Sequence, residues 1–329
     1  MQTLTGNSLP SGLVAFRLNG SGGAREISPE ELEKTEATTG PLWIHVDFSN
    51  PTGAEWLKQA SHLDEVTSSA MLEDNSRPRN FQNESGVLAI LRGINLNAGA
   101  DAADMISIRI WVEENRVITA SRRDLRSIAE IRAALAAGRG PVSPTKFFIE
   151  MVDQLRFYIG EFSENIEEKL ENIEAGYLND GKIVNRSPFR QIRQQTAHVR
   201  RYLVPQRDCL ERISRISDFL FSREQQFELR EQVNGFTLVL EDLDLVRERA
   251  TVAQEEFLGI MAHEQNTRML VLSIVAAIFL PLSFLTGLMG MNVAGLPGLE
   301  NEWAFAILVV IMLILTGLIL WIFKIKKWF

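Results

Sequence analysis

The polar chemistry of the C-terminal region is concentrated in one short stretch, GLMGMNVAGLPG, from Gly287 to Gly298. Asn292 is its only strongly polar side chain and no residue in it is charged. The carbonyl oxygen of an amide accepts hydrogen bonds from the water shell of a cation, and Mg²⁺ in particular gives up that shell reluctantly. Repeated by rotational symmetry, one asparagine per subunit would form a ring. A helix cap or a turn beside Gly290 and Gly295 explains the same residue without an ion.

The segment before this stretch carries small and hydroxylated side chains on one helical face. Small residues let membrane helices pack closely, which is one explanation of the pattern. The other is a pore, in which Met269 and Leu280 form narrow apolar rings and Ser283 offers an oxygen. Pro281 is tolerated in such a helix where neighbouring helices or water satisfy the freed carbonyl. The residues of this face, spaced by three or four, are Asn266, Met269, Ser273, Ala276, Leu280, Ser283 and Gly287.

Candidate metal ligands elsewhere are few. Zinc prefers nitrogen and sulfur ligands, yet the four histidines form no dense motif such as HExxH. His263 lies near the inner end of the predicted pore helix, where a transient zinc contact is conceivable, and Glu255 is a candidate for an acidic inner mouth. Both residues are equally compatible with an ordinary solvated helix face. The single cysteine, Cys209, excludes an internal disulfide and a paired-cysteine metal motif, so we expect a small core residue.

Two uncharged runs must position these residues. They extend from Met269 to Leu299 and from Trp303 to Phe323. Crossing about 30 Å of hydrocarbon takes roughly 20 helical residues, so each run is long enough to span a membrane. Between the runs lie Glu300 and Glu302, which either concentrate cations at a pore mouth or are ordinary solvated loop charges.

Basic residues set the expected orientation. Lys324, Lys326 and Lys327 follow the second run and Arg268 precedes the first. Positive flanks stay in the cytoplasm, so we expect both termini to be cytoplasmic and the short loop to face outward. The N-terminus lacks the basic start and apolar core of a signal peptide.

The remaining residues, 1–265, are acidic. They contain 40 acidic and 30 basic residues, a net charge of −10. Such a region is unsuited to nucleic acid and attracts cations.

Residues 1–140 have the pattern of a mixed α/β domain. Segments rich in β-branched and aromatic residues, partly with period two, alternate with short helical patterns, which favours a sheet layered with helices. The expected strands are Leu42–Phe48, Gly86–Leu96, Met105–Glu114 and Arg116–Ser121, the last two forming a hairpin, and the clearest helix is Arg126–Gly138.

Long helices are predicted after this domain. Ser143-Pro144 and Ser187-Pro188 are start signals, and we expect Pro205 to interrupt or kink the second helix. Ser222 and Gln225 form a capping box that opens a third helix, which we expect to continue from about Arg223 to Met289. Its soluble part has apolar residues at alternating spacings of four and three, as in a seam that requires partner helices: Leu229, Val233, Phe236, Leu240 and Leu243.

Several segments resemble the CorA superfamily of divalent-cation transporters. The triplet Gly290-Met291-Asn292 ends the first uncharged run, a short loop leads to the second, and KIKKWF closes the chain. RRYLVPQRD, from Arg200 to Asp208, is similar to that family as well. The segments Ser76–Arg79, Leu91–Asn95 and Phe279–Gly298 look most like its ZntB branch, whose members transport zinc. Magnesium-transporting members usually follow the triplet with a stretch containing Met-Pro-Glu, which is absent from the loop VAGLPGLENEW here.

The resemblance implies a homopentamer with a cytoplasmic funnel, a pore lined by the first span, and the Gly290-Met291-Asn292 triplet as external selectivity element. It implies no resident cofactor; Zn²⁺ is the expected cargo in a bacterial inner membrane, with Mg²⁺, Co²⁺, Cd²⁺ and Ni²⁺ as further candidates. The expected domains are 1–140 (cytoplasmic α/β), 141–268 (stalk or funnel), 269–289 (first span), 290–302 (outer loop), 303–323 (second span) and 324–329 (basic tail).

Alternative functions remain at this stage. A magnesium or cobalt channel belongs to the same superfamily. A two-span sensor or scaffold is disfavoured by the short loop between the spans. An enzyme is disfavoured because no phosphate loop, GxGxxG motif or nucleophile elbow is present. No acidic residue lies inside either span to carry a proton, which favours a passive channel or a proton path through water over a relay within the spans.

Overall fold

The computed structural model describes residues 9, 11–28, 31–32, 40–59, 61–74, 77–180, 187–216, 219–291, 296 and 301–326. The chain divides into two compact units, Met1–Gln254 and Glu255–Phe329. The first unit contains the expected α/β domain together with the soluble helices, and the second contains both apolar runs.

The described elements follow the order expected from the sequence, with three short or early strands added. The strands are β1 (Leu13–Leu18), β2 (Ala24–Glu26), β3 (Leu42–Asp47), β4 (Arg79–Gln82), β5 (Val87–Gly93), β6 (Ile106–Val112) and β7 (Arg116–Ser121). The helices are α2 (Pro51–Gln59), α3 (Glu65–Leu72), α4 (Arg126–Ala136), α5 (Pro144–Asp180), α6 (Ser187–Ile216), α7 (Arg223–Met289) and α8 (Ala304–Ile325).

A mixed sheet forms the base of the first unit. Its strand order is β2-β1-β3-β7-β6-β5-β4, and β3 with β7 is its parallel pair. The hairpin β6–β7 is antiparallel, as predicted. The strands β1, β2 and β4 were not predicted; β4 is mostly exposed and lies at an edge, so its sequence RNFQ lacks the alternation that marks a half-buried strand.

Helices cover the two faces of this sheet. On one face α2 and α3 contribute Leu57 and Met71 to a core with Ile44, Ile90 and Trp111. On the other face α5 contacts β5, β6 and β7. Because apolar cover lies on both sides, every residue of β5 is buried, which explains its apolar run from Val87 to Leu91.

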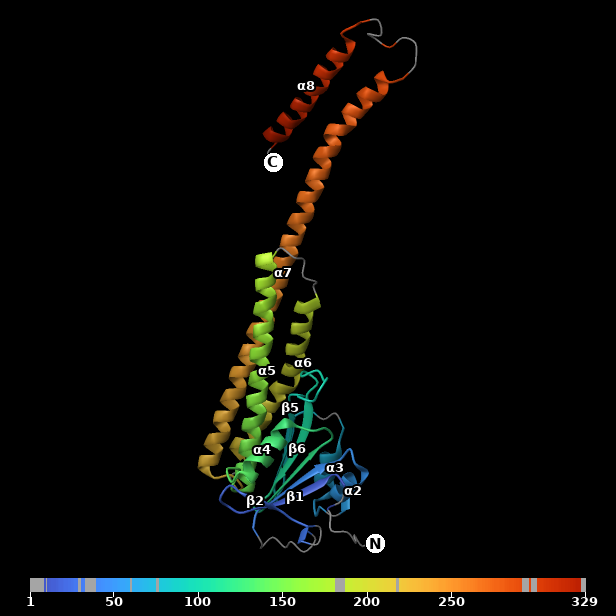
Figure 1. The fold of residues 1–329 in the computed structure, drawn as a ribbon. Coiled ribbons are helices and arrows are strands. Elements are labelled where there is room, and N and C mark those ends of the chain that lie inside the picture. Colours follow the sequence, from blue (N-terminus) through green and yellow to red (C-terminus); the bar gives the residue numbers. More distant parts are fainter. Residues whose placement is uncertain are drawn as a thin grey trace. The chain divides into compact units, whose positions relative to one another are not determined.

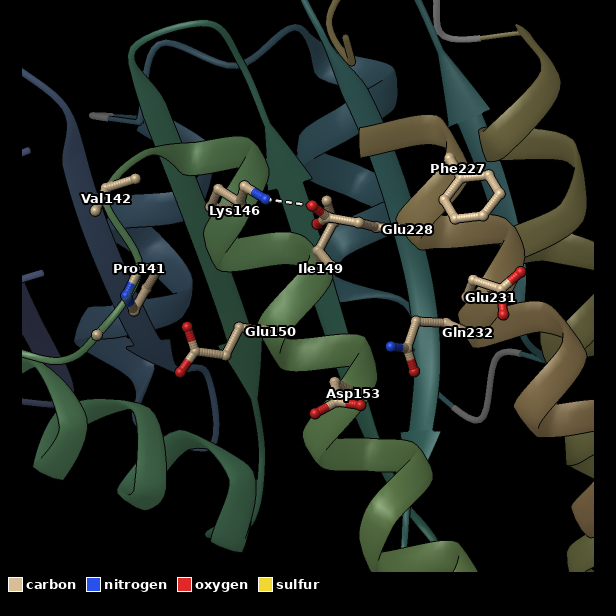
Figure 2. Close-up of a pocket in the computed structure, with 11 residues that line it drawn as sticks. Pro141, Val142, Lys146, Ile149, Glu150, Asp153, Phe227, Glu228, Glu231 and Gln232 are labelled. Atoms are coloured by element: carbon tan, nitrogen blue, oxygen red, sulfur yellow. Dashed lines mark hydrogen bonds and ion pairs between the residues drawn. The ribbon is translucent and has the colours of Figure 1, made fainter. Parts of the chain in front are cut away.

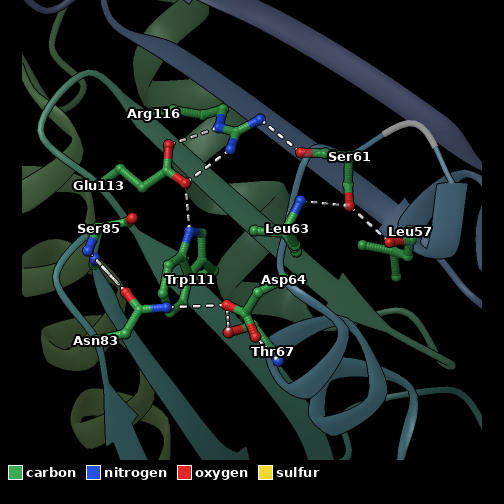
Figure 3. A network of polar contacts seen from close by, with 11 residues as sticks. Leu57, Ser61, Leu63, Asp64, Thr67, Asn83, Ser85, Trp111, Glu113 and Arg116 are labelled. Carbon is green, nitrogen blue, oxygen red and sulfur yellow. Dashed lines mark hydrogen bonds and ion pairs between the residues drawn. The ribbon is translucent and has the colours of Figure 1, made fainter.

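A polar network anchors the α2–α3 turn to the β6–β7 hairpin (Figure 3). The carboxylate of Glu113 accepts hydrogen bonds from the Trp111 indole and from the Arg116 guanidinium, which also donates to the Ser61 carbonyl at 2.8 Å. Asp64 caps α3 by accepting from the Thr67 backbone N–H at 2.8 Å. The turn therefore has a fixed position against the sheet although it is mostly polar.

The long helices begin where the sequence predicts. The Ser143 hydroxyl accepts from the Lys146 N–H at the start of α5. Ser222 and Gln225 make both reciprocal bonds of the capping box at the start of α7. Of the interruption or kink expected at Pro205, the interruption is wrong, because α6 continues through this residue. Proline removes one helix hydrogen bond, and packing of the buried neighbours Leu203 and Gln206 offsets this loss.

The seam of α7 is buried, as expected of a helix with partners, and Figure 1 shows α5 and α6 beside the first part of α7. Ion pairs join these helices at three levels. Lys146 of α5 contacts Glu228 of α7 (Figure 2), Arg200 of α6 contacts Asp244 at 2.8 Å, and Arg249 contacts carboxylates of α5. The seam and these pairs fix α7 within the first unit.

Candidate functional site

Two helices of the described residues, α7 and α8, are long and apolar enough to cross a membrane. α7 is a single helix from Arg223 to Met289, as predicted, and its uncharged part begins at Met269. α8 ends in Ile325, next to the first of the basic residues that close the chain.

The predicted pore face of α7 is exposed along its whole length. Leu280 is 77% exposed and Met269 58%, and the other members are exposed as well. The opposite side of the same span is partly covered: Leu270, Ile274, Ile278, Pro281, Leu282 and Leu285 are half-buried.

α8 has a matching pattern. Its half-buried or buried residues recur every three or four positions on one face, at Ala304, Leu308, Met312, Leu315, Ile319 and Phe323. α8 belongs to the same compact unit as the span of α7. The covered face of each span thus accounts for their packing within one chain. The polar and small-residue face of α7 is left free.

The hydroxyl groups of the first span are oriented by their own helix. Ser273 donates to the Met269 carbonyl at 2.8 Å, and Thr286 donates to the carbonyls of Leu282 and Ser283 at 3.1 Å. Because each hydroxyl donates its proton to a backbone carbonyl of the same helix, the lone pairs of its oxygen remain available to accept hydrogen bonds. Such an oxygen suits the water shell of a cation.

The span ends at the predicted selectivity triplet. The Gly290 N–H donates to the Thr286 carbonyl at 2.9 Å, and the Met291 N–H to the Leu288 carbonyl at 3.4 Å. Asn292 and Glu300 lie outside the described residues. Glu302 is exposed just before α8.

Candidate metal ligands are not clustered. His263 and Glu255 are exposed on α7, and within the part of the chain that the structure describes no group of three His, Cys, Asp or Glu side chains could hold a metal. Cys209 is buried, as expected, and burial raises the pKa of its thiol to about 12. His62 lies in a loop with φ of 55° and His198 is exposed beside Tyr202.

Sequence reasoning missed a buried arginine in the sheet. Arg109 of β6 is 3% exposed, and its guanidinium lies 4.6 Å from the centre of the Phe48 ring and donates to the Glu73 carbonyl. Burial, and then the charge of Arg92, lower its pKa to about 10. The sequence signal that could have revealed this buried charge is the single charged residue within the apolar segment ISIRIWV.

A cavity of about 520 Å³ lies between α5 and α7 of the first unit. Figure 2 shows Glu150 and Asp153 of α5 on one wall and Gln232 of α7 on the other. Burial raises the pKa of Glu150, with a further contribution from Asp153. The guanidinium of Arg156 donates to Gln232 and Asp153 at 2.7 and 2.8 Å, so this polar lining holds the two helices together.

Comparison with known proteins gives a family for this arrangement. Residues 39–326 match the model of the CorA-like Mg²⁺ transporter protein family. The chain is 32% identical over 330 residues, the full length of both proteins, to the zinc transport protein ZntB of Pectobacterium carotovorum. It is 31% identical over 319 residues, 96% of both proteins, to the divalent cation transporter CmaX of Pseudomonas aeruginosa.

A solved structure extends this similarity to the fold. The structure of the full-length CmaX protein matches with a TM-score of 0.85 and 30% identity. The match covers 98% of this chain and all of that one, so it includes the sheet, the long helices and both apolar helices.

Proposed function

This chain belongs to the CorA-like Mg²⁺ transporter family, in its ZntB branch, and on that premise we propose that it carries zinc through the central pore of a homopentamer. Members of the family are transporters of divalent cations and not enzymes, which sets the enzymatic alternative aside. The proposal concerns the cation, the assembly and the path.

Zinc is favoured by two observations. Two curated relatives that are 32% identical to this chain over its full length are named for zinc transport. The loop after Asn292 lacks the Met-Pro-Glu stretch that is usual in magnesium-transporting members. Magnesium or cobalt is the alternative cargo, and a transporter of either would use the same hydrated path.

The uncovered face of the first span carries the proposal of a pore. α8 and the half-buried side of α7 account for packing within one chain, while the face from Asn266 to Gly287 has no cover in the described residues of the chain. An apolar span that exposes the oxygens of Ser273 and Ser283 is favourable where the face meets water rather than lipid. Five copies around one axis would enclose such a path, with Asn292 as a ring at its outer end.

A line of exposed apolar residues on α7, outside its buried seam, supports an assembly. Leu238, Leu245 and Val252 are 53–61% exposed and recur every seven residues on the soluble part of the helix. Apolar side chains at heptad spacing require a partner helix, and a second copy of α7 provides one.

The topology follows from charge. Lys324 in the last turn of α8, Lys326 just after it, and Arg268 before the span of α7 favour a cytoplasmic location for both termini and the outer side for the loop. We place the protein in the bacterial inner membrane, with the acidic first unit in the cytoplasm as a region that attracts cations.

Zinc flux into proteoliposomes that contain the full chain tests the function. We expect zinc entry to depend on the protein, with excess Mg²⁺ competing weakly. Repeating the assay with and without a pH gradient separates passive conduction from proton coupling. Protein-dependent magnesium entry without zinc entry would contradict the assigned cargo.

The Asn292→Ala variant tests the amide ring. We expect flux to fall at least tenfold while assembly and yield remain normal, because the entrance loses the acceptor for the cation's water shell. Asn301→Ser is the matched control: it removes an amide of the same loop outside the triplet, while the serine hydroxyl can still accept from the Trp303 N–H as Asn301 does, and its flux should be unchanged. Normal flux through the Asn292→Ala protein would remove this residue from the pathway.

A further inference from the structure

The two helices that precede α7 have opposite charge. α5 contains nine acidic and three basic residues, whereas α6 contains seven arginines and two acidic residues. A difference of this size between neighbouring helices exceeds what solubility requires.

The acidic charge of α5 forms an exposed stripe. Glu161, Glu164 and Glu168 are all exposed and are spaced by three and four residues. This spacing places them on one face of the helix. The acidic stripe, defined by these three glutamates, faces away from the buried residues Phe162 and Ile166.

The basic charge of α6 forms an exposed line. Arg190, Arg201 and Arg212 are exposed and lie eleven residues apart, which is about three helical turns, so they share one direction. The basic stripe, defined by these three arginines, is separate from the buried side of α6 at Leu203 and Leu210.

The two stripes do not neutralise each other within the chain. Among the described residues, no ion pair joins α5 to α6. Arg200 pairs with Asp244 of α7, Arg207 pairs with its neighbour Asp208, and Arg215 pairs with Glu211 of its own helix. The acids of α5 that do pair across helices with Arg249 are Glu167, Glu171 and Glu174.

We propose that the acidic stripe of α5 binds the basic stripe of α6 of the next copy of this chain. The inference rests on the proposed homopentamer and specifies which surfaces join its subunits. A closed ring requires two different, complementary patches on each subunit, because a head-to-tail contact repeats around the axis. Opposite charges on separate helices meet this requirement, and like-charged stripes oppose the two self-pairings. At 1.5 Å per residue the acidic stripe is about 10 Å long and the basic stripe about 33 Å long, so the acidic stripe lies against one part of the basic stripe.

Charge reversal in the full chain tests the interface. One variant carries Glu161→Lys, Glu164→Lys and Glu168→Lys, a second carries Arg190→Glu, Arg201→Glu and Arg212→Glu, and a third combines all six. The control carries Glu55→Lys, Glu65→Lys and Glu84→Lys, three exposed acids of the α/β region that change the net charge equally. The oligomeric state is measured by native mass spectrometry in detergent at low and high salt.

We expect the fraction of pentamer to fall several-fold at low salt in each single-stripe variant. In the variant with all six changes the fraction should recover, because the two stripes again have opposite charges, with their signs exchanged. The control should assemble as the wild type does. High salt should weaken the wild-type assembly, since the Debye length falls to about 3 Å at 1 M. Single-stripe variants that assemble normally, or a six-fold variant that fails while the control assembles, would overturn the interface.

Measuring zinc flux through the wild type in parallel distinguishes a failure of this interface from a failure of the proposed function. If the wild type is pentameric and transports zinc, and the stripe variants assemble normally, the interface alone is rejected. A wild type that is not pentameric would reject both the interface and the proposed assembly.

Discussion

His45 lies on β3 with its Nδ1 atom 2.9 Å from the hydroxyl oxygen of Thr119 on the adjacent strand. The Trp43 indole donates to the same oxygen at 2.9 Å. Burial lowers the pKa of His45 to about 4, partly opposed by Asp47, so the imidazole is neutral at physiological pH. His45 is therefore a structural histidine that links β3 to β7 through the Thr119 hydroxyl.

A neutral buried imidazole makes stability depend on pH. The unfolded chain binds a proton near pH 6.5 and the folded one near 4, so stability is full above about 6.5 and falls as the pH is lowered toward 4. We expect a loss of about 2 kcal/mol over this window, since one pKa unit corresponds to about 1.4 kcal/mol and the ring is partly exposed.

His45→Gln should flatten this dependence, whereas the exposed His62→Gln should leave it unchanged. Thermal unfolding of the full chain in detergent between pH 7.5 and 4.5 measures the difference. Equal pH profiles for the wild type and the His45 variant would show that another group titrates.

At the scale of elements, α7 is held to α5 by an arginine among carboxylates. Arg249 lies 2.9 Å from Glu167, 3.0 Å from Glu174 and 3.8 Å from Glu171. The hydrogen bond to Glu174 is the main reason that the pKa of Arg249 is raised. The cluster lies a few residues before the end of the first unit at Gln254. It is the last ion pair among those described that joins α7 to another helix of that unit.

Removing this arginine leaves three carboxylates without a counter-charge. For Arg249→Gln we expect a loss of about 1 kcal/mol, or ~2–4 °C in melting temperature, because exposed pairs contribute little individually and three like charges then repel. Arg223→Gln, at an exposed arginine of the same helix, is the control. The difference between the two variants should shrink in 1 M salt; a difference independent of salt would point to packing instead.

At the scale of the whole molecule, the chain consists of two units, one built like a water-soluble domain and one built like helices that meet lipid. Nearly all buried apolar residues belong to Met1–Gln254, whereas the second unit exposes most of its apolar residues, as helices that meet lipid do. The first unit has its own core of sheet and helices, so its folding does not depend on the membrane.

A fragment of residues 1–254 should therefore fold without detergent. We expect a soluble product with cooperative thermal unfolding and mixed α/β circular dichroism. A fragment of residues 1–222 is the matched control, because it lacks α7 and exposes the faces of α5 and α6 that cover Leu229, Phe236 and Leu243. Aggregation of the longer fragment would show that the second unit is needed for the first to fold.

The sequence by itself determined the elements whose signals are local. Long uncharged runs define membrane spans by length, and Ser-Pro starts and the capping box define helix beginnings, because each depends on residues within one or two turns. The similarity of the Gly290-Met291-Asn292 triplet to the CorA superfamily also depends on the residues alone, and the family match confirms that superfamily. The role of Asn292 stays a prediction.

Only the tertiary structure decided which faces are covered. The stripe from Asn266 to Gly287 fits helix packing and pore lining equally well in sequence. The structure shows that no part of the described chain covers it, and its role in lining a pore stays a prediction. The strand β4 and the carboxylates around Arg249 were also inaccessible to sequence reasoning. Each depends on contacts between residues far apart in the chain, and burial and charge pairing of this kind leave no local periodicity to detect.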